Sequence, residues 1–242
     1  MEETSLVADA KELGQRAFAG AVAGFVSGLL VGGIGGRLAM FLLRVTSGAA
    51  VVGRQSDDDF TMGSFTPSTM FLVMAAAVMG VVGGLCYSLA RGWLPERFRP
   101  LISAVLFALI GGVAVIKPGG VDFTLVKPAA LSIFLFILLP GIYGYCVAKL
   151  AERWLARKIG KIAPWLGLLA ALLPIMIMGT GASGLGGLLV LAVIALWFVG
   201  RRISALRKLP SHPAVTWLGR GALTIGAAAA GVFLMKDILE IL

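Results

Sequence analysis

Three consecutive aspartates, Asp57, Asp58 and Asp59, form the densest acidic group in the chain. Carboxylate oxygens bind hard cations such as Ca²⁺, and clusters of carboxylates collect cations at the mouths of channels. The tripeptide Asp-Phe-Thr at 59–61 recurs at 122–124, which adds Asp122 to the group. We therefore predict an outer cation site or solute entrance at these four aspartates. A solvated loop that caps the next helix is the alternative, and the recurrence favours a turn-forming role for Asp59 itself.

The segment GTGASG at 179–184 matches two short motifs. As G-x-G-x-x-G it would bind a dinucleotide, but that fingerprint needs a strand before it and a βαβ unit, whereas apolar segments lie on both sides here. Its GASG portion resembles the nucleophile motif of rhomboid intramembrane proteases, with Ser183 in the serine position. Those enzymes need a histidine in another membrane helix to accept the serine proton. The only histidine, His212, falls in a loop on the side opposite Ser183, so we predict a helix–helix turn.

Pro140 and Gly141 lie near the middle of an apolar segment that is long enough to cross a bilayer. A proline inside a helix removes one backbone hydrogen bond and frees a carbonyl group. Broken helices at the middle of the membrane form the substrate sites of many transporters built from repeats. We therefore treat Pro140 and Gly141 as a candidate helix break, with an ordinary kink as the alternative.

Other residue types argue against catalysis. No ionisable side chain falls in the middle of an apolar segment, which argues against proton-coupled and voltage-sensing mechanisms. Cys86 and Cys146 both lie in apolar segments, which argues against a disulfide framework or a zinc site. The sequence therefore predicts no catalytic residue, no metal and no cofactor. A lipid-modifying enzyme is the remaining enzymatic alternative, and the lack of clustered His, Cys or paired carboxylates weighs against it.

The composition places these residues in a membrane. Of the 242 residues, 59% are hydrophobic and 14% charged, and the mean hydropathy is +0.96, far from soluble averages. A bilayer core needs about 20 apolar residues per helix. The first 16 residues lack the basic leader of a signal peptide, so we expect the first span to be retained. We predict one all-α integral membrane domain over 1–242, with spans at 17–36, 70–89, 101–116, 129–148, 162–179, 185–200 and 217–235.

The distribution of basic residues predicts the orientation. Lys and Arg accumulate in cytoplasmic loops. With the N-terminus inside, inner segments hold fourteen Lys and Arg residues and outer segments hold five. All five tryptophans also fall at inner helix ends or inner loops, as an interfacial belt would place them. We predict an N-in, C-out bundle in the bacterial inner membrane. The basic inner face is explained by orientation and anionic lipid, and we expect no nucleic-acid partner.

An internal repeat relates two segments at an offset of 61 residues. Laying 67–94 on 128–155 without a gap gives seven identities in 28 positions, including Gly80 with Gly141, Gly83 with Gly144 and a shared terminal Trp-Leu. We predict two helical hairpins that run in the same direction, repeat 1 over 17–94 and repeat 2 over 100–155. A diverged third copy over 162–200 and a lone helix over 217–238 complete the expected arrangement.

Glycine occupies every fourth position in the first apolar segment, at Gly20, Gly24, Gly28, Gly32 and Gly36. Lipid tails are as apolar as leucine, so membrane helices associate through close contact, which small residues permit. We call this row the glycine ridge and expect it to pack against small residues of the second and seventh spans. The expected partners are Ala76, Gly80 and Gly84 in the second span and Ala222, Gly226 and Ala230 in the seventh. Contact with another protein chain is the alternative.

Two functions are compatible with these features. The first is non-enzymatic transport or permeation of a small solute or ion through the repeat-built bundle. The second is a membrane-embedded structural subunit or assembly factor that docks other helices through its small-residue faces. The expected partners are the lipid bilayer and either further copies of this chain or other membrane subunits.

Overall fold

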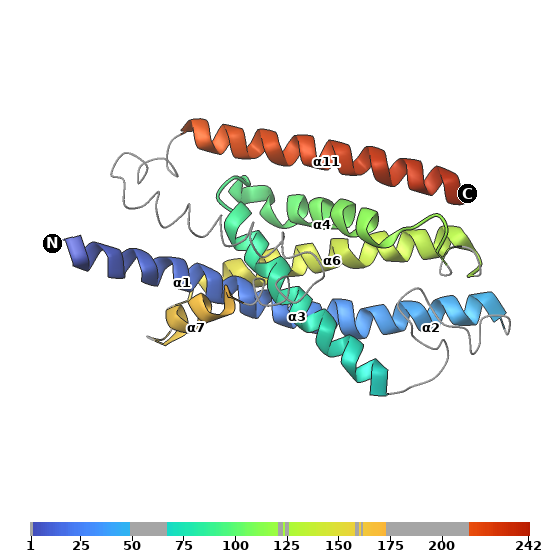
Figure 1. The fold of residues 1–242 in the computed structure, drawn as a ribbon, viewed down its shortest axis with the longest axis horizontal. Helices are drawn as coiled ribbons and strands as arrows, with labels where there is room; N and C mark the ends of the chain where they lie inside the picture. The colour runs from blue at the N-terminus through green and yellow to red at the C-terminus, as the bar shows by residue number, and fades with distance from the viewer. Residues whose placement is uncertain are drawn as a thin grey trace.

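The computed structural model describes residues 2–48, 67–120, 123, 126–157, 160, 162–172 and 213–242, and these form helices and turns with no strand. The prediction of an all-α fold is therefore confirmed for this part of the chain, and five of its helices are long and apolar enough to cross a membrane. In chain order the elements are α1 (Glu2–Ser27), η1 (Gly28–Gly35), α2 (Gly36–Ser47), α3 (Pro67–Ala90), η3 (Glu96–Phe98), α4 (Arg99–Val115), α6 (Ala129–Leu155), α7 (Ala163–Ala170) and α11 (Pro213–Ile241) (Figure 1).

The first membrane helix is much longer than the predicted span at 17–36. The elements α1, η1 and α2 follow one another without a break, and the apolar candidate span covers Ala10–Ser47. The apolar run resumes directly after Arg37, so one charged residue does not end the helix. At its end, the hydroxyl groups of Thr46 and Ser47 donate to carbonyl oxygens one turn earlier. Arg37 and Arg44 therefore lie inside a helix and not at a span end or in a loop.

The glycine ridge faces α3 at its first four positions, and nothing lies within 4 Å of a Cβ built on the fifth, Gly36. A Cβ atom placed on Gly24 would overlap the carbonyl oxygen of Gly80, and one on Gly20 would overlap the Ser88 hydroxyl. At Gly28 the added atom would lie 2.5 Å from the carbonyl oxygen of Ala76. The two backbones touch here because glycines of one helix meet Gly80 and Gly84 of the other and only small side chains lie beside them. The ridge does not meet the seventh predicted span, since no atom lies within 4 Å of a Cβ built on Gly226.

The second helical pair, α4 and α6, packs around Pro140. A Cβ on Gly111 of α4 would lie 2.5 Å from Cβ and Cγ of Pro140, so the missing side chain makes room for the proline ring. The helix α6 continues through Pro140 and Gly141, where the sequence offered either a helix break or an ordinary kink. The neighbouring helix supplies the space that the ring needs, and the other hydrogen bonds of α6 maintain the helix.

The helices share two ends, which we name after one residue each. The Arg91 end contains the last turn of α3, the first turn of α4, the last turn of α6 and the start of α11, where Nε of Arg220 donates to the carbonyl oxygen of Trp93 at 2.9 Å. The Lys127 end contains the last turn of α2, joined to the α4–α6 loop by a 3.0 Å hydrogen bond from the Ser47 hydroxyl to the carbonyl oxygen of Lys127. It also contains the last turn of α11.

Glu152 of α6 binds three side chains at the Arg91 end. Arg91 donates from Nε and Nη2 to its two carboxylate oxygens at 2.9 and 2.8 Å, and the Tyr87 hydroxyl donates at 2.8 Å. Nη1 of Arg99 approaches the same carboxylate at 3.4 Å. These bonds raise the pKa of Arg91 above its ordinary value, so its guanidinium keeps its charge. The Glu152 cluster, defined as Tyr87, Arg91, Arg99 and Glu152, thus fixes three helices to one another.

Two predicted spans lie largely outside the described residues. Of 162–179 the structure describes 162–172, with α7 over Ala163–Ala170, and 185–200 is outside the described residues. The helix α7 runs alongside the second half of α1, beginning where a Cβ on Gly14 would overlap the carbonyl oxygen of Pro164. The last helix, α11, extends beyond the predicted 217–235 at both ends.

Candidate functional site: an arginine between the two ends of the bundle

Arg37 is the charged residue placed deepest between the two ends of the bundle. It lies ten residues before Ser47, the last residue of α2, which corresponds to about 15 Å along the helix axis. Its neighbour Gly35 contacts Leu139, ten residues into α6, so both helices give the same depth. A hydrocarbon core is about 30 Å thick. Arg37 therefore lies near the middle of the region that a bilayer would cover.

The side chain of Arg37 is half-buried. Its Nε and Nη2 atoms are both buried. An arginine near a membrane surface usually extends its charged group toward the headgroups, and an arginine retained in the interior faces a protein-lined or hydrated space. An ionisable side chain at such a position marks a solute pathway or a charge partner in membrane proteins.

The helix changes its winding directly before Arg37. The element η1 is a π-helix from Gly28 to Gly35, with the sequence GLLVGGIG. In a π-helix the hydrogen bonds span five residues, and such segments occur often at functional sites. Glycine lowers the cost of this geometry because it adds no side-chain crowding. The result is a wide, glycine-rich helix wall beside the level of Leu139 and Pro140.

Two buried hydroxyl groups lie on the same helices. Ser27 precedes η1, and Ser132 lies in the first turn of α6. Neither hydroxyl oxygen has a hydrogen-bond partner in the described part of the chain. An unpaired buried hydroxyl marks a place where water or a ligand group would satisfy it. Polar groups are thus present on both sides of Arg37 along the bundle.

A small apolar cluster separates Arg37 from the Lys127 end. Leu43 of α2 and Val126 of the α4–α6 loop are its buried members, 5% and 3% exposed. Leu131, Leu135 and Phe136 of α6 pack against them. Hydrophobic constrictions of this kind can close a pathway by excluding water. We refer to these five residues as the Leu43 cluster.

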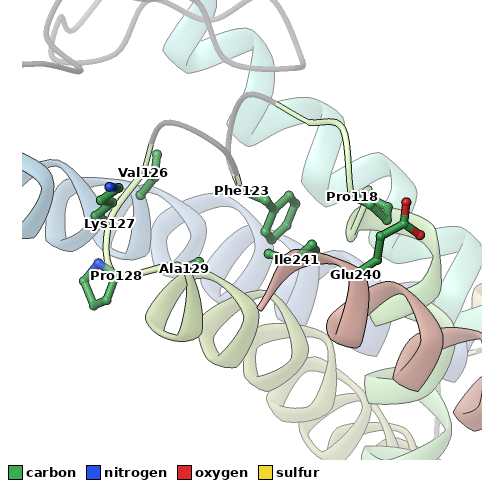
Figure 2. A pocket seen from close by; sticks show the side chains of 8 residues that line it. All are labelled: Pro118, Phe123, Val126, Lys127, Pro128, Ala129, Glu240 and Ile241. Atoms are coloured by element: carbon green, nitrogen blue, oxygen red, sulfur yellow. The ribbon is translucent and has the colours of Figure 1, made fainter.

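A pocket of about 410 Å³ opens at the Lys127 end, between the α4–α6 loop and the end of α11 (Figure 2). Figure 2 shows Lys127 and Glu240 at opposite sides of it, with the ring of Phe123 between them. Val126 lines the pocket and also belongs to the Leu43 cluster. The pocket, the cluster and Arg37 therefore follow one another from the Lys127 end inward. The pocket lining is completed by Pro118, Pro128, Ala129 and Ile241.

The predicted site residues are placed only in part. Asp57, Asp58, Asp59 and Asp122 lie outside the described residues, as do Ser183 and His212. Phe123, next to Asp122, lines the pocket. Pro140 and Gly141 lie one and two residues after Leu139, which contacts the π-helix. Within the described ranges no group of three His, Cys, Asp or Glu side chains is placed to hold a metal ion, and Cys86 and Cys146 are free thiols.

Sequence reasoning missed Arg37 because it ended the first span at Gly36. The signal was present, since six apolar residues, 38–43, follow the arginine directly.

Comparisons of the chain with protein-family models, curated proteins and solved structures gave no match. The described part belongs to the broad class of apolar helical bundles compatible with an integral membrane protein.

Proposed function

We propose that this protein is a non-enzymatic membrane protein that conducts or carries a small solute with an anionic group. The observation that carries the proposal is Arg37, a half-buried arginine whose Nε and Nη2 atoms are buried and which follows a glycine-rich π-helix between the two ends of the bundle. A guanidinium donates several hydrogen bonds and pairs preferentially with oxygen anions, so Arg37 favours an anionic solute over a cation. The proposed binding group is Arg37 and not a carbonyl group freed at a break in α6, because α6 is continuous at Pro140.

The proposed route begins at the pocket at the Lys127 end. Lys127 supplies a positive charge at this pocket, and Glu240 lies across from it. The Leu43 cluster then forms the closed segment of the route, and Arg37 provides the central binding group. Because the Leu43 cluster is packed, the route is closed in this structure, and solute passage requires Leu43 and Val126 to separate.

Flux into proteoliposomes tests the proposal. Chloride and a small carboxylate such as acetate serve as anionic probes, with potassium and glycerol as cationic and neutral probes. We expect the protein to accelerate at least one anionic probe over empty liposomes, and Arg37→Gln to remove that acceleration while Arg37→Lys retains part of it. Lys236→Gln is the matched control, because it removes one exposed positive charge near the end of α11.

Two results would overturn the proposal. One is the absence of any accelerated probe in liposomes that contain folded protein, as judged by circular dichroism and gel filtration. The other is an Arg37→Gln variant that keeps the wild-type rate and selectivity. A variant that loses flux together with its helical signal is replaced by Arg37→Lys, which preserves the charge and tests the same position.

We also propose that the bundle is built from two equivalent hairpins, α1–α3 and α4–α6. A Cβ built on Gly80 would meet the backbones of Gly24 and Gly28. A Cβ built on its equivalent, Gly141, would lie 3.4 Å from Cβ of Ala108 and 3.5 Å from the carbonyl oxygen of Ala104. Each glycine thus packs on a pair of small residues four positions apart. In the same alignment Arg91 is equivalent to Glu152, and these two residues form an ion pair.

The orientation that we propose places the Arg91 end in the cytoplasm. Among residues with described side chains, nine Lys or Arg residues lie at or near this end and four at the Lys127 end, and short cytoplasmic segments are enriched in both. Trp93, Trp154, Trp165 and Trp217 also belong to helix ends at this side. A seven-span topology with N-in and C-out follows if 162–179 and 185–200 both cross.

A second function, docking of a transmembrane helix from another chain, is supported by α11. Ala222, Gly226 and Ala229 are all exposed on this helix, and Ala222 and Gly226 are four positions apart. Lipid-facing positions usually carry large apolar side chains, whereas small residues mark helix–helix contacts. Native mass spectrometry after gentle extraction tests this function. A second chain whose binding is lost in Gly226→Leu, with Ile225→Leu as the control, supports it; a monomer without partners contradicts it.

A further inference from the structure

The first turn of α4 has an unusual distribution of charge. Arg97 and Arg99 lie directly at this turn, which contains no acidic residue and has no side-chain cap. A helix N-terminus carries a partial positive charge and normally attracts acidic side chains. Two arginines at this position add positive charge to positive charge. Glu96 is 88% exposed and contacts Arg99 at 3.2 Å, and Glu152 approaches the same guanidinium at 3.4 Å, so Arg97 supplies the excess positive charge at this turn.

Arg99 is held in place by two carboxylates, and Arg97 has no ion pair in the described part of the chain. The Arg99 side chain is 12% exposed, and it is held by Glu152 and Glu96. Its Nε atom is buried without a hydrogen-bond partner in the described part of the chain. Arg97 is exposed, and its guanidinium carbon lies 5.4 Å from the centre of the Phe98 ring. Together the two guanidiniums and the α4 N-terminus form a positive site at the Arg91 end.

An apolar strip leads away from this positive site along α4. Phe98, Leu101 and Val105 are 47%, 57% and 58% exposed. Leu101 and Val105 are four positions apart in α4 and so lie on one face of the helix, and Phe98 directly precedes the helix. The strip therefore descends from the arginines toward the middle of the bundle, along the direction in which an acyl chain would extend. Arginine above an exposed aromatic ring is also typical of a membrane interface.

We propose that Arg97, Arg99 and the N-terminus of α4 bind the phosphate of an anionic phospholipid, with one acyl chain lying on Phe98, Leu101 and Val105. A monoanionic diester phosphate, as in phosphatidylglycerol, matches this site because it offers acceptor oxygens to the guanidiniums and the helix dipole. Basic sites between or beside membrane helices at the cytoplasmic side bind such headgroups. This site is separate from Arg37 and does not depend on the proposed transport function.

Lipid titration followed by native mass spectrometry tests this site on the full chain in detergent. We expect phosphatidylglycerol to bind more tightly than phosphatidylcholine, and Arg97→Gln to weaken phosphatidylglycerol by about fivefold, the effect of one basic residue near an anionic surface. Glu96→Gln should strengthen it, because the variant removes the competing carboxylate. Lys236→Gln is the control, since it removes one positive charge at the other end of the bundle and should leave the affinity unchanged.

Three further results decide the proposal. Soluble glycerol phosphate that competes fully at the same concentration as the lipid would show that the acyl strip contributes nothing and would overturn the lipid assignment. Equal weakening by Lys236→Gln and Arg97→Gln would show a general charge effect and would also overturn it. Leu101→Asn that weakens the intact lipid but not glycerol phosphate supports it. Arg97 is exposed, so Arg97→Gln should leave the melting temperature unchanged and the comparison valid.

Discussion

The Glu152 cluster leads to a quantitative prediction for Glu152→Gln. The substitution removes the charge that Arg91 binds in bidentate geometry and that also holds Arg99 and the Tyr87 hydroxyl. Breaking a buried ion pair leaves the partner charges uncompensated and costs about 3–5 kcal/mol. Here the side chains of Arg91, Arg99 and Glu152 are 19%, 12% and 31% exposed, so water screens part of the loss. We therefore expect the free energy of unfolding to fall by about 2–3 kcal/mol.

The assay is steric trapping in detergent micelles, which measures the free energy of unfolding of membrane proteins. Glu12→Gln is the matched control, since Glu12 pairs with Arg16 one helix turn away and both side chains are about half exposed or more; it should cost under about 0.5 kcal/mol. The double variant Arg91→Met/Glu152→Leu should be less destabilised than the sum of the single variants. Equal stability of Glu152→Gln and the wild type, or strict additivity in the double variant, would refute the reasoning.

Three further predictions concern packing. Gly24→Ala should destabilise the protein by about 1–3 kcal/mol because the new methyl group meets the Gly80 backbone. The control Gly36→Ala should leave the stability unchanged, because nothing lies within 4 Å of its Cβ. Equal losses of stability in steric trapping would contradict this prediction. Gly111→Val should lower the melting temperature by overlap with Pro140, and adding Pro140→Ala should restore part of it; a double variant no better than Gly111→Val counts against that contact. Tyr143→Phe should cost about 1 kcal/mol through loss of its 2.6 Å hydrogen bond to Gly80, measured against Tyr145→Phe, and equal values for the two variants would exclude that bond.

Much of the helical architecture can be predicted from apolar segment length. The spans predicted at 70–89 and 101–116 agree closely with α3 and α4. Glycine spacing also identified a close-packed helix face, because only a residue without a side chain allows two backbones to touch. The sequence limited the partner of that face to segments with small residues. It could not distinguish α3 from α11, because both have small residues at the same spacing.

The candidate site was less accessible from the sequence. Arg37 was read as a span boundary because charge normally ends an apolar segment, and burial of its Nε and Nη2 atoms depends on helices distant in the chain. Proline alone cannot distinguish a break from a continuous helix, because the outcome is set by Gly111 on the neighbouring helix. The ion pair of Arg91 and Glu152 joins residues 61 positions apart; their equivalence in the repeat was visible, but their contact required the fold.

The shared ends of the helices have a consequence for the sidedness of the two termini. If each of the five long helices crosses once, the chain has crossed four times by the end of α6, at the Arg91 end, and α11 begins at this same end. On that condition, α1 begins at the Arg91 end and α11 ends at the Lys127 end, so residues 2 and 242 would lie on opposite faces of the membrane. Reporter domains fused to the two termini should accordingly show opposite accessibility.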